Sequence, residues 1–416
     1  MKVALVTQPY DGVLPPRQNS IGLILYHTAL ELARFADVSV CLKRQTRGTE
    51  LSGHPFEIEE IDTPVDDLLT SWATRHPRLA NRIGATRFAD QYPQYVRRVA
   101  TRLSRKAVDI VHTMNYWSWC RNLSSARTGH KLVLEMQAEW LSQMDPRAVG
   151  RQLEHADAVV TVSDHIARLF KQALPGYRGL VATAYNGVNV DVFRPAAEPV
   201  TESAGERSIL FVGRTSPEKG VHVLIEAFAK IAALHDDARL DIVGPRTTLP
   251  ARHLVALSDD PVVRGLSAFY DGSITTDYQG YLNDLVQKRG LTDKVRFHGS
   301  LPHQKLVEIY QRSYVVCNPS FSESFGISIV EGMACAKPVV AANIGGMQET
   351  IVHGTTGFHV EPDQPDALAS AVSRILVDSA LARRMGTSGR ERAVTQFTWA
   401  ARARRLLDLY AQTVGS

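Results

Sequence analysis

The sequence contains few of the features that mark special classes of protein. Its four cysteines, Cys41, Cys120, Cys317 and Cys335, lie far apart and form no Cys-x-x-Cys pair, which argues against a disulfide framework and a zinc ribbon. No run approaches the roughly 20 uninterrupted apolar residues that a membrane-spanning helix needs. Met1–Val6 leads directly into a strand-like pattern, without the apolar core of a secretory signal. We therefore expect a reducing, cytoplasmic environment.

A strong excess of charge of one sign is also lacking. There are 47 Lys and Arg against 43 Asp and Glu, and the formal net charge is +4, which gives no argument for nucleic-acid binding. With 44% hydrophobic and 22% charged residues, the composition is that of a soluble globular protein and excludes disorder, collagen and a coiled coil. A length of 416 residues predicts two or three domains of roughly 100–200 residues each.

Short β-branched runs alternate with helical patterns through the whole chain. Strands are predicted at Val3–Thr7, Val38–Leu42, Ile110–His112, Leu132–Glu135, Ala158–Val162, Ser208–Gly213, Arg239–Gly244, Lys294–His298, Tyr314–Asn318 and Pro338–Ala342. Helices are predicted at Ile21–Phe35, Gln94–Lys106, Val221–Leu234, Leu301–Arg312 and Phe325–Cys335. Such alternation indicates an α/β protein with doubly wound parallel sheets, covered by helices on both faces.

The polar run Pro195–Arg207 has no apolar period and is predicted to be an interdomain linker. It divides the chain into residues 1–195 and 196–396, each the size of one doubly wound domain. Two such domains that face each other would form a ligand-binding cleft. The segment Arg246–Gly280 is too long for an ordinary connection, so we expect it to be functional or mobile.

The densest chemical signal runs from Asn318 to Gly346. A strand ends at Cys317, Glu323 lies in the following loop, Phe325-Gly326 opens a helix, and Glu331 follows about two turns beyond Glu323. A helix N-terminus suits an anion such as phosphate, and a glycine lets the ligand approach the backbone. Glu323 could then hold sugar hydroxyls and Glu331 ribose hydroxyls. The alternative is a capping carboxylate and a solvent-facing glutamate.

A second signal combines a strand, a glycine and two cations. After Phe211-Val-Gly213 come Arg214 and Lys219, directly before Gly220 and a helix. Two cations at the carboxyl end of a strand, beside a helix N-terminus, are typical of a diphosphate clamp, although ordinary surface charges are the alternative. The Walker order is absent, and no Gly-x-Gly-x-x-Gly follows the first strand, which argues against a P-loop enzyme and a dehydrogenase.

Together these segments resemble the large retaining glycosyltransferase family 4. The resemblance rests on Glu323-x7-Glu331, Gly213-Arg214-x4-Lys219-Gly220, Phe297-His-Gly299, Gly345-Gly346, and the turn from Asn186-Gly-Val188 to Phe193-Arg-Pro195. It is close over most of Tyr185–Pro362 and looser in the first half. It implies the GT-B fold, with two Rossmann-like domains, and a C-terminal helix at 397–416 that packs back on the first domain. It also implies that the second domain binds a nucleotide-sugar and the first binds the acceptor.

The resemblance assigns roles residue by residue. It implies catalytic roles for Arg214, Lys219, Glu323 and His112, and donor contacts for Gly22, Gly213, Phe297, Ser324, Phe325, Gly326, Ile327 and Glu331. It implies a UDP-sugar donor first and a GDP-sugar second, with the base contacted near Phe297–Ser300. We expect neither metal nor cofactor, because the two cations take the part of a divalent ion. Retention of configuration implies front-face attack, with Glu323 as covalent nucleophile the alternative.

The first half departs from the family pattern at two positions. The usual His-x-His reads His112-Thr-Met114 here, followed by Asn115. Either Asn115 replaces the missing histidine or His112 serves instead, and a core histidine at a strand end is the alternative. The usual Gly-Gly of the first loop is replaced by Arg17–Gly22, in which Ser20 is a candidate N-cap.

A basic stretch runs from Arg75 to Lys106, with eight arginines and one lysine against a single acid, Asp90, and with interleaved aromatic residues such as Phe88. It could contact an anionic membrane from the cytoplasmic side or bind a phosphorylated acceptor, and a solvated helical face is the alternative. No nucleic-acid motif accompanies it.

We expect the acceptor to be a hydroxyl of a glycan, a glycolipid or a small molecule. Two rival functions stay open: a pseudo-glycosyltransferase that couples a nucleotide-activated cyclitol to an amine, and a catalytically silent nucleotide-sugar-binding protein.

Overall fold

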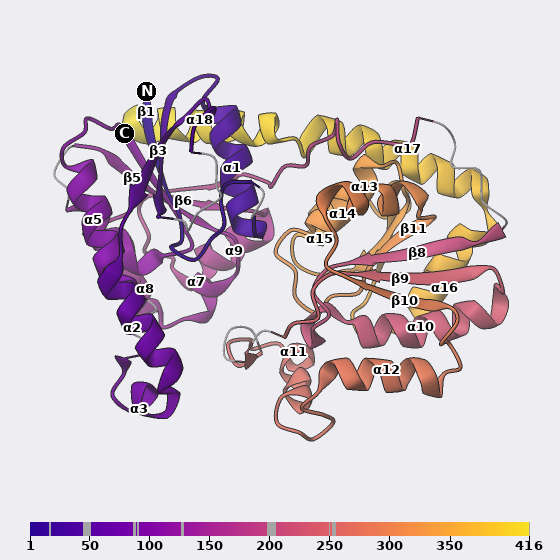
Figure 1. Ribbon diagram of the computed structural model, residues 1–416. Helices are drawn as coiled ribbons and strands as arrows, with labels where there is room; N and C mark the ends of the chain where they lie inside the picture. Colours follow the sequence, from indigo (N-terminus) through magenta and orange to yellow (C-terminus); the bar gives the residue numbers. More distant parts are fainter. Residues whose placement is uncertain are drawn as a thin grey trace. The chain divides into compact units, whose positions relative to one another are not determined.

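The computed structural model describes residues 1–15, 18–44, 51–85, 89, 91–125, 129–197, 205–248, 250–251 and 255–415. They form two compact units, each built on one parallel sheet (Figure 1). Unit 1 comprises Met1–Val162, Ile166–Tyr185 and Trp399–Ser416, and unit 2 comprises Ser163–His165 and Asn186–Thr398. Residues 198–204 of the predicted linker lie outside the described part.

Unit 1 contains a seven-stranded sheet in the order β3-β2-β1-β4-β5-β6-β7. Its strands are β1 (Lys2–Val6), β2 (Asp37–Lys43), β3 (Glu57–Ile61), β4 (Ile110–Met114), β5 (Lys131–Met136), β6 (Ala158–Thr161) and β7 (Leu180–Thr183). Its helices are α1 (Ser20–Leu32), α2 (Pro64–Arg75), α3 (Pro77–Arg82), α5 (Pro93–Leu103), η1 (Trp117–Trp119), α6 (Cys120–Ser124), α7 (Trp140–Gln143), α8 (Pro146–Leu153), α9 (Asp164–Ala173) and α18 (Trp399–Gly415).

Unit 2 contains a six-stranded sheet in the order β10-β9-β8-β11-β12-β13. Its strands are β8 (Arg207–Val212), β9 (Ala238–Val243), β10 (Val295–Gly299), β11 (Val315–Asn318), β12 (Val339–Ala342) and β13 (Gly357–Val360). Its helices are η3 (Pro217–Lys219), α10 (Val221–Leu234), α11 (Pro261–Gly265), η5 (Leu266–Phe269), α12 (Tyr278–Lys288), α13 (His303–Arg312), α14 (Ile327–Ala334), α15 (Met347–Thr350), α16 (Pro365–Val377) and α17 (Ser379–Gln396).

These two sheets confirm the predicted fold class of two Rossmann-like doubly wound domains. Each of the ten predicted strands is present, and the central ones are buried along most of their length. In both sheets every strand runs parallel to its neighbours. Parallel strands buried on both faces read as continuous apolar runs, which is why the sequence revealed them.

Helix α18 lies far from unit 1 in sequence but belongs to it in space. It packs against α1, and its apolar residues Leu406, Leu409 and Tyr410 join the core that contains β1 and β2 (Figure 1). The last helix of the chain therefore completes the core of unit 1.

The segment Arg246–Gly280 is partly helical, so less of it is a loop than the sequence indicated. Residues 249 and 252–254 lie outside the described part. It contains α11 and η5 and ends in the first turn of α12. Phe269 and Tyr278 pack on the ring of His222 in α10, and Tyr278 Oη lies 2.8 Å from His222 Nδ1. Phe269 and Tyr278 of this segment thus cover the first turn of α10 at His222.

Candidate functional site

In unit 2 the strand order reverses between β8 and β11. In an open parallel sheet, ligands bind at such a point, in the crevice beyond the carboxyl ends of the strands. The loop that carries Arg214 and Lys219 follows β8, and the loop that carries Glu323 follows β11. The structure therefore places the two motifs found in the sequence side by side.

An ion pair joins these two loops. Lys219 Nζ lies 2.8 Å from Glu323 Oε2, and each side chain is 18% exposed. The other carboxylate oxygen of Glu323 accepts a hydrogen bond from the Gly326 N–H at 3.1 Å, at the start of α14. Burial alone would raise the pKa of Glu323, but the charge of Lys219 and these hydrogen bonds hold that pKa below its ordinary value. Glu323 is therefore a carboxylate, and in this structure it also caps the loop, as the alternative interpretation proposed.

Glycines fix the shape of the Glu323 loop. The Gly346 N–H donates to the Glu323 carbonyl at 3.1 Å, and a Cβ added at Gly346 would lie 2.2 Å from the Ser324 carbonyl oxygen. Gly345 has a φ of +52° and its added Cβ would lie 2.0 Å from the Glu323 oxygen. Only residues without a side chain allow this approach. The backbone of Gly345-Gly346 therefore packs directly against the backbone of the Glu323 loop.

A buried carboxylate that the sequence analysis missed holds Arg214. Glu218 Oε1 lies 3.3 Å from Arg214 Nη2 and accepts a hydrogen bond from Ser216 Oγ at 2.5 Å. Arg214 Nε is buried without a hydrogen-bond partner in the part of the chain that is described. Glu218 thus positions the guanidinium, and its only sequence signal is its place between the two cations.

Glu331 is not the solvent-facing residue that the alternative interpretation required. It lies on α14, partly buried, and Tyr310 Oη lies 2.7 Å from Glu331 Oε2. Burial raises the pKa of Glu331 to about 7, although the hydrogen bond from Tyr310 opposes this. Tyr310, on α13, was also missed, because only the tertiary structure brings it to α14.

The remaining predicted donor contacts of unit 2 surround this site or lie near it. Gly213 follows β8, and its N–H donates to the Val243 carbonyl at 2.9 Å. Phe297 lies on β10, beneath the guanidinium carbon of Arg246 at 4.8 Å from the ring centroid. Ser324, Phe325 and Ile327 lie in the loop and first turn that lead into α14.

Gly22 lies in unit 1, and its environment differs from the expectation. Its N–H donates to Asn19 Oδ1 at 2.8 Å, so the N-cap of α1 is Asn19 and the prediction of Ser20 was wrong. Asn19 is extended, with its side-chain oxygen directed at the first turn, whereas Ser20 is already helical. A Cβ at Gly22 would lie 1.8 Å from the Gly12 carbonyl oxygen, so local packing alone requires a glycine there. Arg17 lies outside the described residues.

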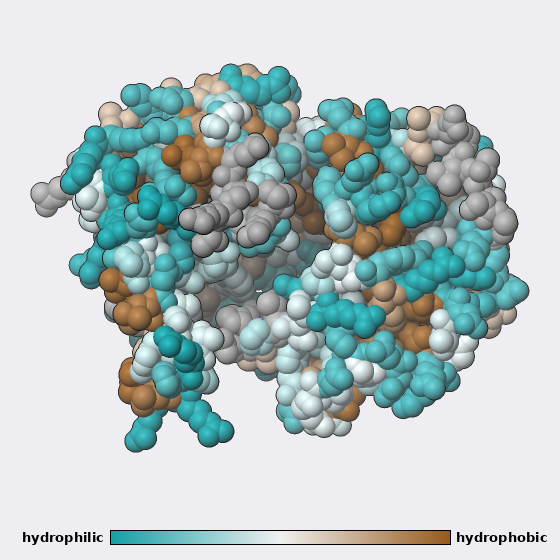
Figure 2. Space-filling model, in the orientation of Figure 1, coloured by the Kyte–Doolittle hydropathy of each residue, from teal (hydrophilic) through white to brown (hydrophobic). Residues whose placement is uncertain are grey.

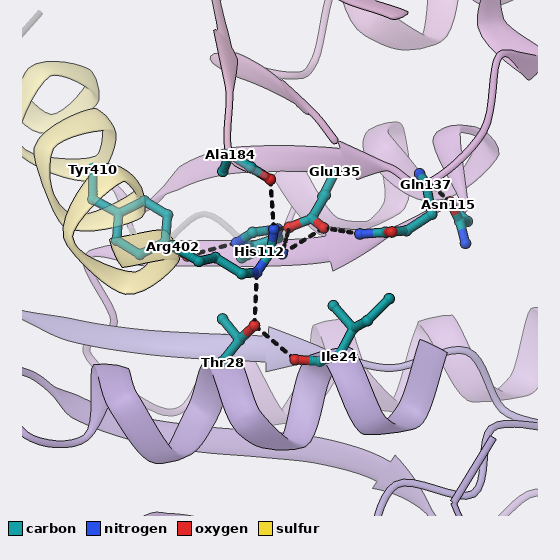
Figure 3. A network of polar contacts seen from close by, with 9 residues as sticks. All are labelled: Ile24, Thr28, His112, Asn115, Glu135, Gln137, Ala184, Arg402 and Tyr410. Carbon is teal, nitrogen blue, oxygen red and sulfur yellow. Dashed lines mark hydrogen bonds and ion pairs between the residues drawn. The ribbon is translucent and has the colours of Figure 1, made fainter. Parts of the chain in front are cut away.

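His112 is enclosed in the core of unit 1 and is 2% exposed. Its Nδ1 lies 2.5 Å from Tyr410 Oη of α18, and its Nε2 lies 3.1 Å from Glu135 Oε2 (Figure 3). Arg402, also on α18, contacts both carboxylate oxygens of Glu135 at 2.6 Å. This environment favours the interpretation of His112 as a core histidine, and its catalytic role stays a prediction.

Part of the basic stretch is neutralised within unit 1. Lys106 Nζ lies 2.6 Å from Glu59 and 2.9 Å from Glu57 on β3, and Arg102 lies 3.8 Å from Glu59. The arginines of α2 and α3 are exposed instead. Phe88 and Asp90 lie outside the described residues.

Two features are absent from the described residues. They contain no group of three or more His, Cys, Asp or Glu side chains arranged to hold a metal ion. None of their helices combines the length and apolar character needed to cross a membrane.

Comparison with known families matches both halves of the chain. Residues 194–392 match the model described as "Glycosyl transferases group 1", and residues 24–192 match "Glycosyltransferase Family 4". A D-inositol 3-phosphate glycosyltransferase of Corynebacterium urealyticum is 27% identical over 334 residues, which cover 74% of this chain and 73% of that protein.

Solved structures of similar fold include two that cover nearly the whole chain. Sucrose-phosphate synthase from Thermosynechococcus elongatus aligns with a TM-score of 0.72 at 23% identity, over 100% of this chain and 99% of its own. Anabaena Alr3699/HepE in complex with UDP aligns with a TM-score of 0.72 at 20% identity, over 99% of this chain and 100% of its own. At these identities the likeness establishes the fold.

Proposed function

The chain belongs to glycosyltransferase family 4, with the group 1 glycosyl transferase domain in its second half, and we propose that it transfers a hexose from a UDP-sugar to an acceptor hydroxyl with retention of configuration. UDP is proposed as the carrier because Anabaena Alr3699/HepE, a structural neighbour, is described in complex with UDP. A GDP-sugar is the second choice.

The observation that carries the proposal is the Lys219–Glu323 pair, at 2.8 Å, where the strand order reverses. Arg214 lies on the same loop as Lys219, so two cations stand at the carboxyl end of β8. We assign them to the diphosphate of the donor, Glu323 to the hydroxyls of the transferred sugar, and Glu331 to the ribose. Gly326 has a φ of +85°, and a Cβ there would lie 2.8 Å from Met347 Cγ, so only glycine fits the turn that leads into α14.

The proposed reaction needs no protein nucleophile. The bond between the anomeric carbon and the diphosphate oxygen breaks, and the acceptor oxygen bonds to the same face of that carbon. The proton of the acceptor hydroxyl passes to the leaving phosphate oxygen. Negative charge grows on the diphosphate in the transition state, and fixed cations directed at it lower the barrier without reorganisation. We propose that Arg214 and Lys219 supply this stabilisation and that no metal is required.

The contacts of Glu323 support this front-face route over a covalent intermediate. One carboxylate oxygen is paired with the Lys219 ammonium, and the other accepts the Gly326 N–H. A carboxylate with both oxygens engaged by donors is a weak nucleophile, and its remaining lone pairs still accept sugar hydroxyls.

The test is nucleotide release from UDP-, GDP-, ADP- and TDP-sugars in the presence of EDTA, with slow hydrolysis to water in place of an acceptor. Release from the UDP-sugar, with the α-anomer of the sugar formed from an α-donor and detected by NMR, supports the proposal. Turnover of an ordinary nucleotide-sugar also excludes the cyclitol-coupling rival. Binding of one nucleotide without release under any condition would favour the silent binding protein.

We further propose that unit 1 contacts an anionic membrane through α2 and α3 rather than through the whole basic stretch. Leu68, Leu79 and Ile83 are more than half exposed there, beside exposed Arg78 and Arg82. Figure 2 shows brown patches over this part of unit 1, at the lower left. Apolar side chains flanked by cations suit the surface of a membrane with anionic lipids.

Sedimentation with vesicles that contain phosphatidylglycerol tests this contact. Arg78→Glu with Arg82→Glu should abolish co-sedimentation, whereas Arg383→Glu with Arg384→Glu, an equal change of charge on exposed residues of α17, should leave it unchanged. Equal loss of co-sedimentation in both variants would mean that net charge alone, and not α2 and α3, binds the vesicles. A wild-type protein that never co-sediments would exclude the contact.

A further inference from the structure

The long segment Arg246–Gly280 reaches the loop that carries the two proposed diphosphate cations. We call residues 213–220 the cation loop. On one side it is supported by the loop after β11, where the Phe321 N–H donates to the Glu218 carbonyl at 2.8 Å. On another side it contacts the first turn of α12, which ends the long segment and belongs to a helix that packs on α10 (Figure 1).

Gln279 of α12 pairs with the cation loop in two directions. Gln279 Oε1 accepts a hydrogen bond from Thr215 Oγ1 at 2.9 Å, and Gln279 Nε2 donates to the Thr215 carbonyl. Thr215 is buried, and its own N–H donates to the Pro245 carbonyl at 3.1 Å. The backbone beside Arg214 is therefore fixed from both sides, and one side chain of α12 supplies two of the hydrogen bonds.

Tyr278, the residue before Gln279, holds the other end of the cation loop. The His222 N–H donates to Tyr278 Oη at 3.3 Å, and that Oη lies 2.8 Å from His222 Nδ1. His222 follows Lys219 by three residues. Burial lowers the pKa of His222 to about 4, so its imidazole is neutral at physiological pH. Two adjacent residues of α12 thus contact both ends of the loop.

The first turn of α12 is itself well anchored. Its N-cap is Asp277, whose Oδ1 accepts the Gly280 N–H at 3.0 Å. Phe269, Tyr278 and Leu282 are buried in the core of unit 2, and the rings of Phe269 and Tyr278 meet edge to face at 5.3 Å. A cap and a buried ring contact therefore fix the turn from which Gln279 reaches Thr215.

The Arg214 side chain is held less firmly than the backbone beside it. Its Nη2 lies 3.3 Å from Glu218 Oε1, and the side chain is 36% exposed. A charge-assisted hydrogen bond is ordinarily about 2.7–2.9 Å long. The position of the guanidinium therefore depends strongly on the backbone from which it projects. Cations stabilise a developing charge best when they are fixed before the reaction.

We propose that Gln279, assisted by Tyr278, is a positioning residue that holds the cation loop in place before the donor binds, so that Arg214 is directed at the diphosphate. Neither residue contacts the reacting atoms in this role, because they act through Thr215 and His222. The effect on the diphosphate rests on the proposed glycosyltransferase function, whereas the ordering of the unliganded loop does not. The long segment thereby has a task in unit 2 beyond connecting β9 to α12.

Hydrogen exchange of the unliganded full chain, followed by mass spectrometry, tests the ordering of the loop. Gln279→Met keeps the length of the side chain and removes both hydrogen bonds, and it should speed exchange in peptides of the cation loop about tenfold. Gln287→Met, the same change at an exposed glutamine of the same helix, should not. Unchanged exchange in the loop of Gln279→Met, or an equal increase throughout unit 2, would overturn the proposal.

Calorimetric titration with UDP tests the effect on the diphosphate site. Gln279→Met should weaken UDP binding about tenfold in the wild-type background and less than about twofold in an Arg214→Met background, because it acts through Arg214. Equal weakening in both backgrounds would mean a merely structural role and would contradict the proposal.

The two measurements keep this proposal apart from the proposed function. Faster exchange in the cation loop of Gln279→Met, in a protein whose wild type binds no UDP, would support the ordering of the loop and contradict only the donor assignment. UDP binding that needs Arg214 but is unaffected by Gln279→Met would contradict only the positioning role.

Discussion

Replacing Arg402 should destabilise unit 1 more than any exposed substitution in the same helix. The guanidinium of Arg402 is buried and contacts Glu135 twice at 2.6 Å, the Ala184 carbonyl at 2.7 Å and Thr28 Oγ1 at 2.9 Å (Figure 3). Arg402→Met removes every one of these contacts and leaves the Glu135 carboxylate buried. Breaking a buried ion pair on one side costs about 3–5 kcal/mol.

The pKa of Glu135 gives a second measure of the same interaction. Burial alone would raise that pKa, but Arg402, and then His112, lower it from 4.5 to about 2. A difference of this size corresponds to about 3 kcal/mol of stability. Because the folded-state pKa is depressed, this stability is present above pH 4.5 and is lost as the pH falls from 4.5 towards 2. Wild type and Arg402→Met should therefore converge in stability over that range.

Urea unfolding followed by tryptophan fluorescence measures this effect in unit 1 alone. The chain has five tryptophans, at 72, 117, 119, 140 and 399, and each lies in unit 1. Arg404→Met, an exposed change two residues further along α18, is the matched control and should cost less than about 0.5 kcal/mol. The double change Glu135→Leu with Arg402→Met should recover much of the loss, because neither charge is then buried alone. A loss below 1 kcal/mol in Arg402→Met, or one equal to that of Arg404→Met, would refute the reasoning.

Three further outcomes are expected. UDP affinity should fall as the pH drops through about 7, because burial raises the pKa of Glu331 to about 7 and a neutral carboxyl accepts ribose hydroxyls more weakly than a carboxylate. Calorimetry from pH 5.5 to 8.5 measures this, and Glu331→Gln should remove the contribution of Glu331 to the dependence. Lys219→Ala should lower kcat for nucleotide release on the order of 100-fold if it stabilises the leaving group, and an unchanged kcat in a folded variant would exclude that role. Gly346→Ala should lower both stability and UDP affinity, because its Cβ would lie 2.2 Å from the Ser324 oxygen, whereas Gly265→Ala, with open space around it, should change neither.

The sequence predicted the apolar central strands of both sheets, but it did not predict the polar edge strand β3. Helix α10 matches its predicted bounds, Val221–Leu234, because Gly220 with a φ of +67° begins it sharply. Strand β3 was missed because Glu57, Glu59 and Glu60 obscure its apolar positions. Lys106 of the α5 region neutralises two of these acids, and a local pattern does not reveal that partner.

The same distinction holds for the two sites. The cations and glutamates after β8 and β11 were found because they lie in short motifs beside apolar strands. Tyr310 was missed because only the tertiary structure brings it to Glu331. Glu218 contacts Arg214 and Ser216 within its own loop, and it was missed because one carboxylate between two cations is not distinctive in a sequence. The environment of His112 depends on Tyr410, 298 residues away, so no reading of the local sequence decides its role.

The most direct test of the donor site is a calorimetric titration of UDP into the full chain in EDTA. Each charge-assisted contact contributes about 1.5–3 kcal/mol, so Arg214→Met with Lys219→Met should weaken UDP binding by about 100-fold or more. Lys230→Met, at a half-exposed lysine of α10 that pairs with Asp366, should bind as wild type does. Equal UDP affinity in the wild type and the double variant would contradict the assignment of the nucleotide-sugar site to the loops after β8 and β11.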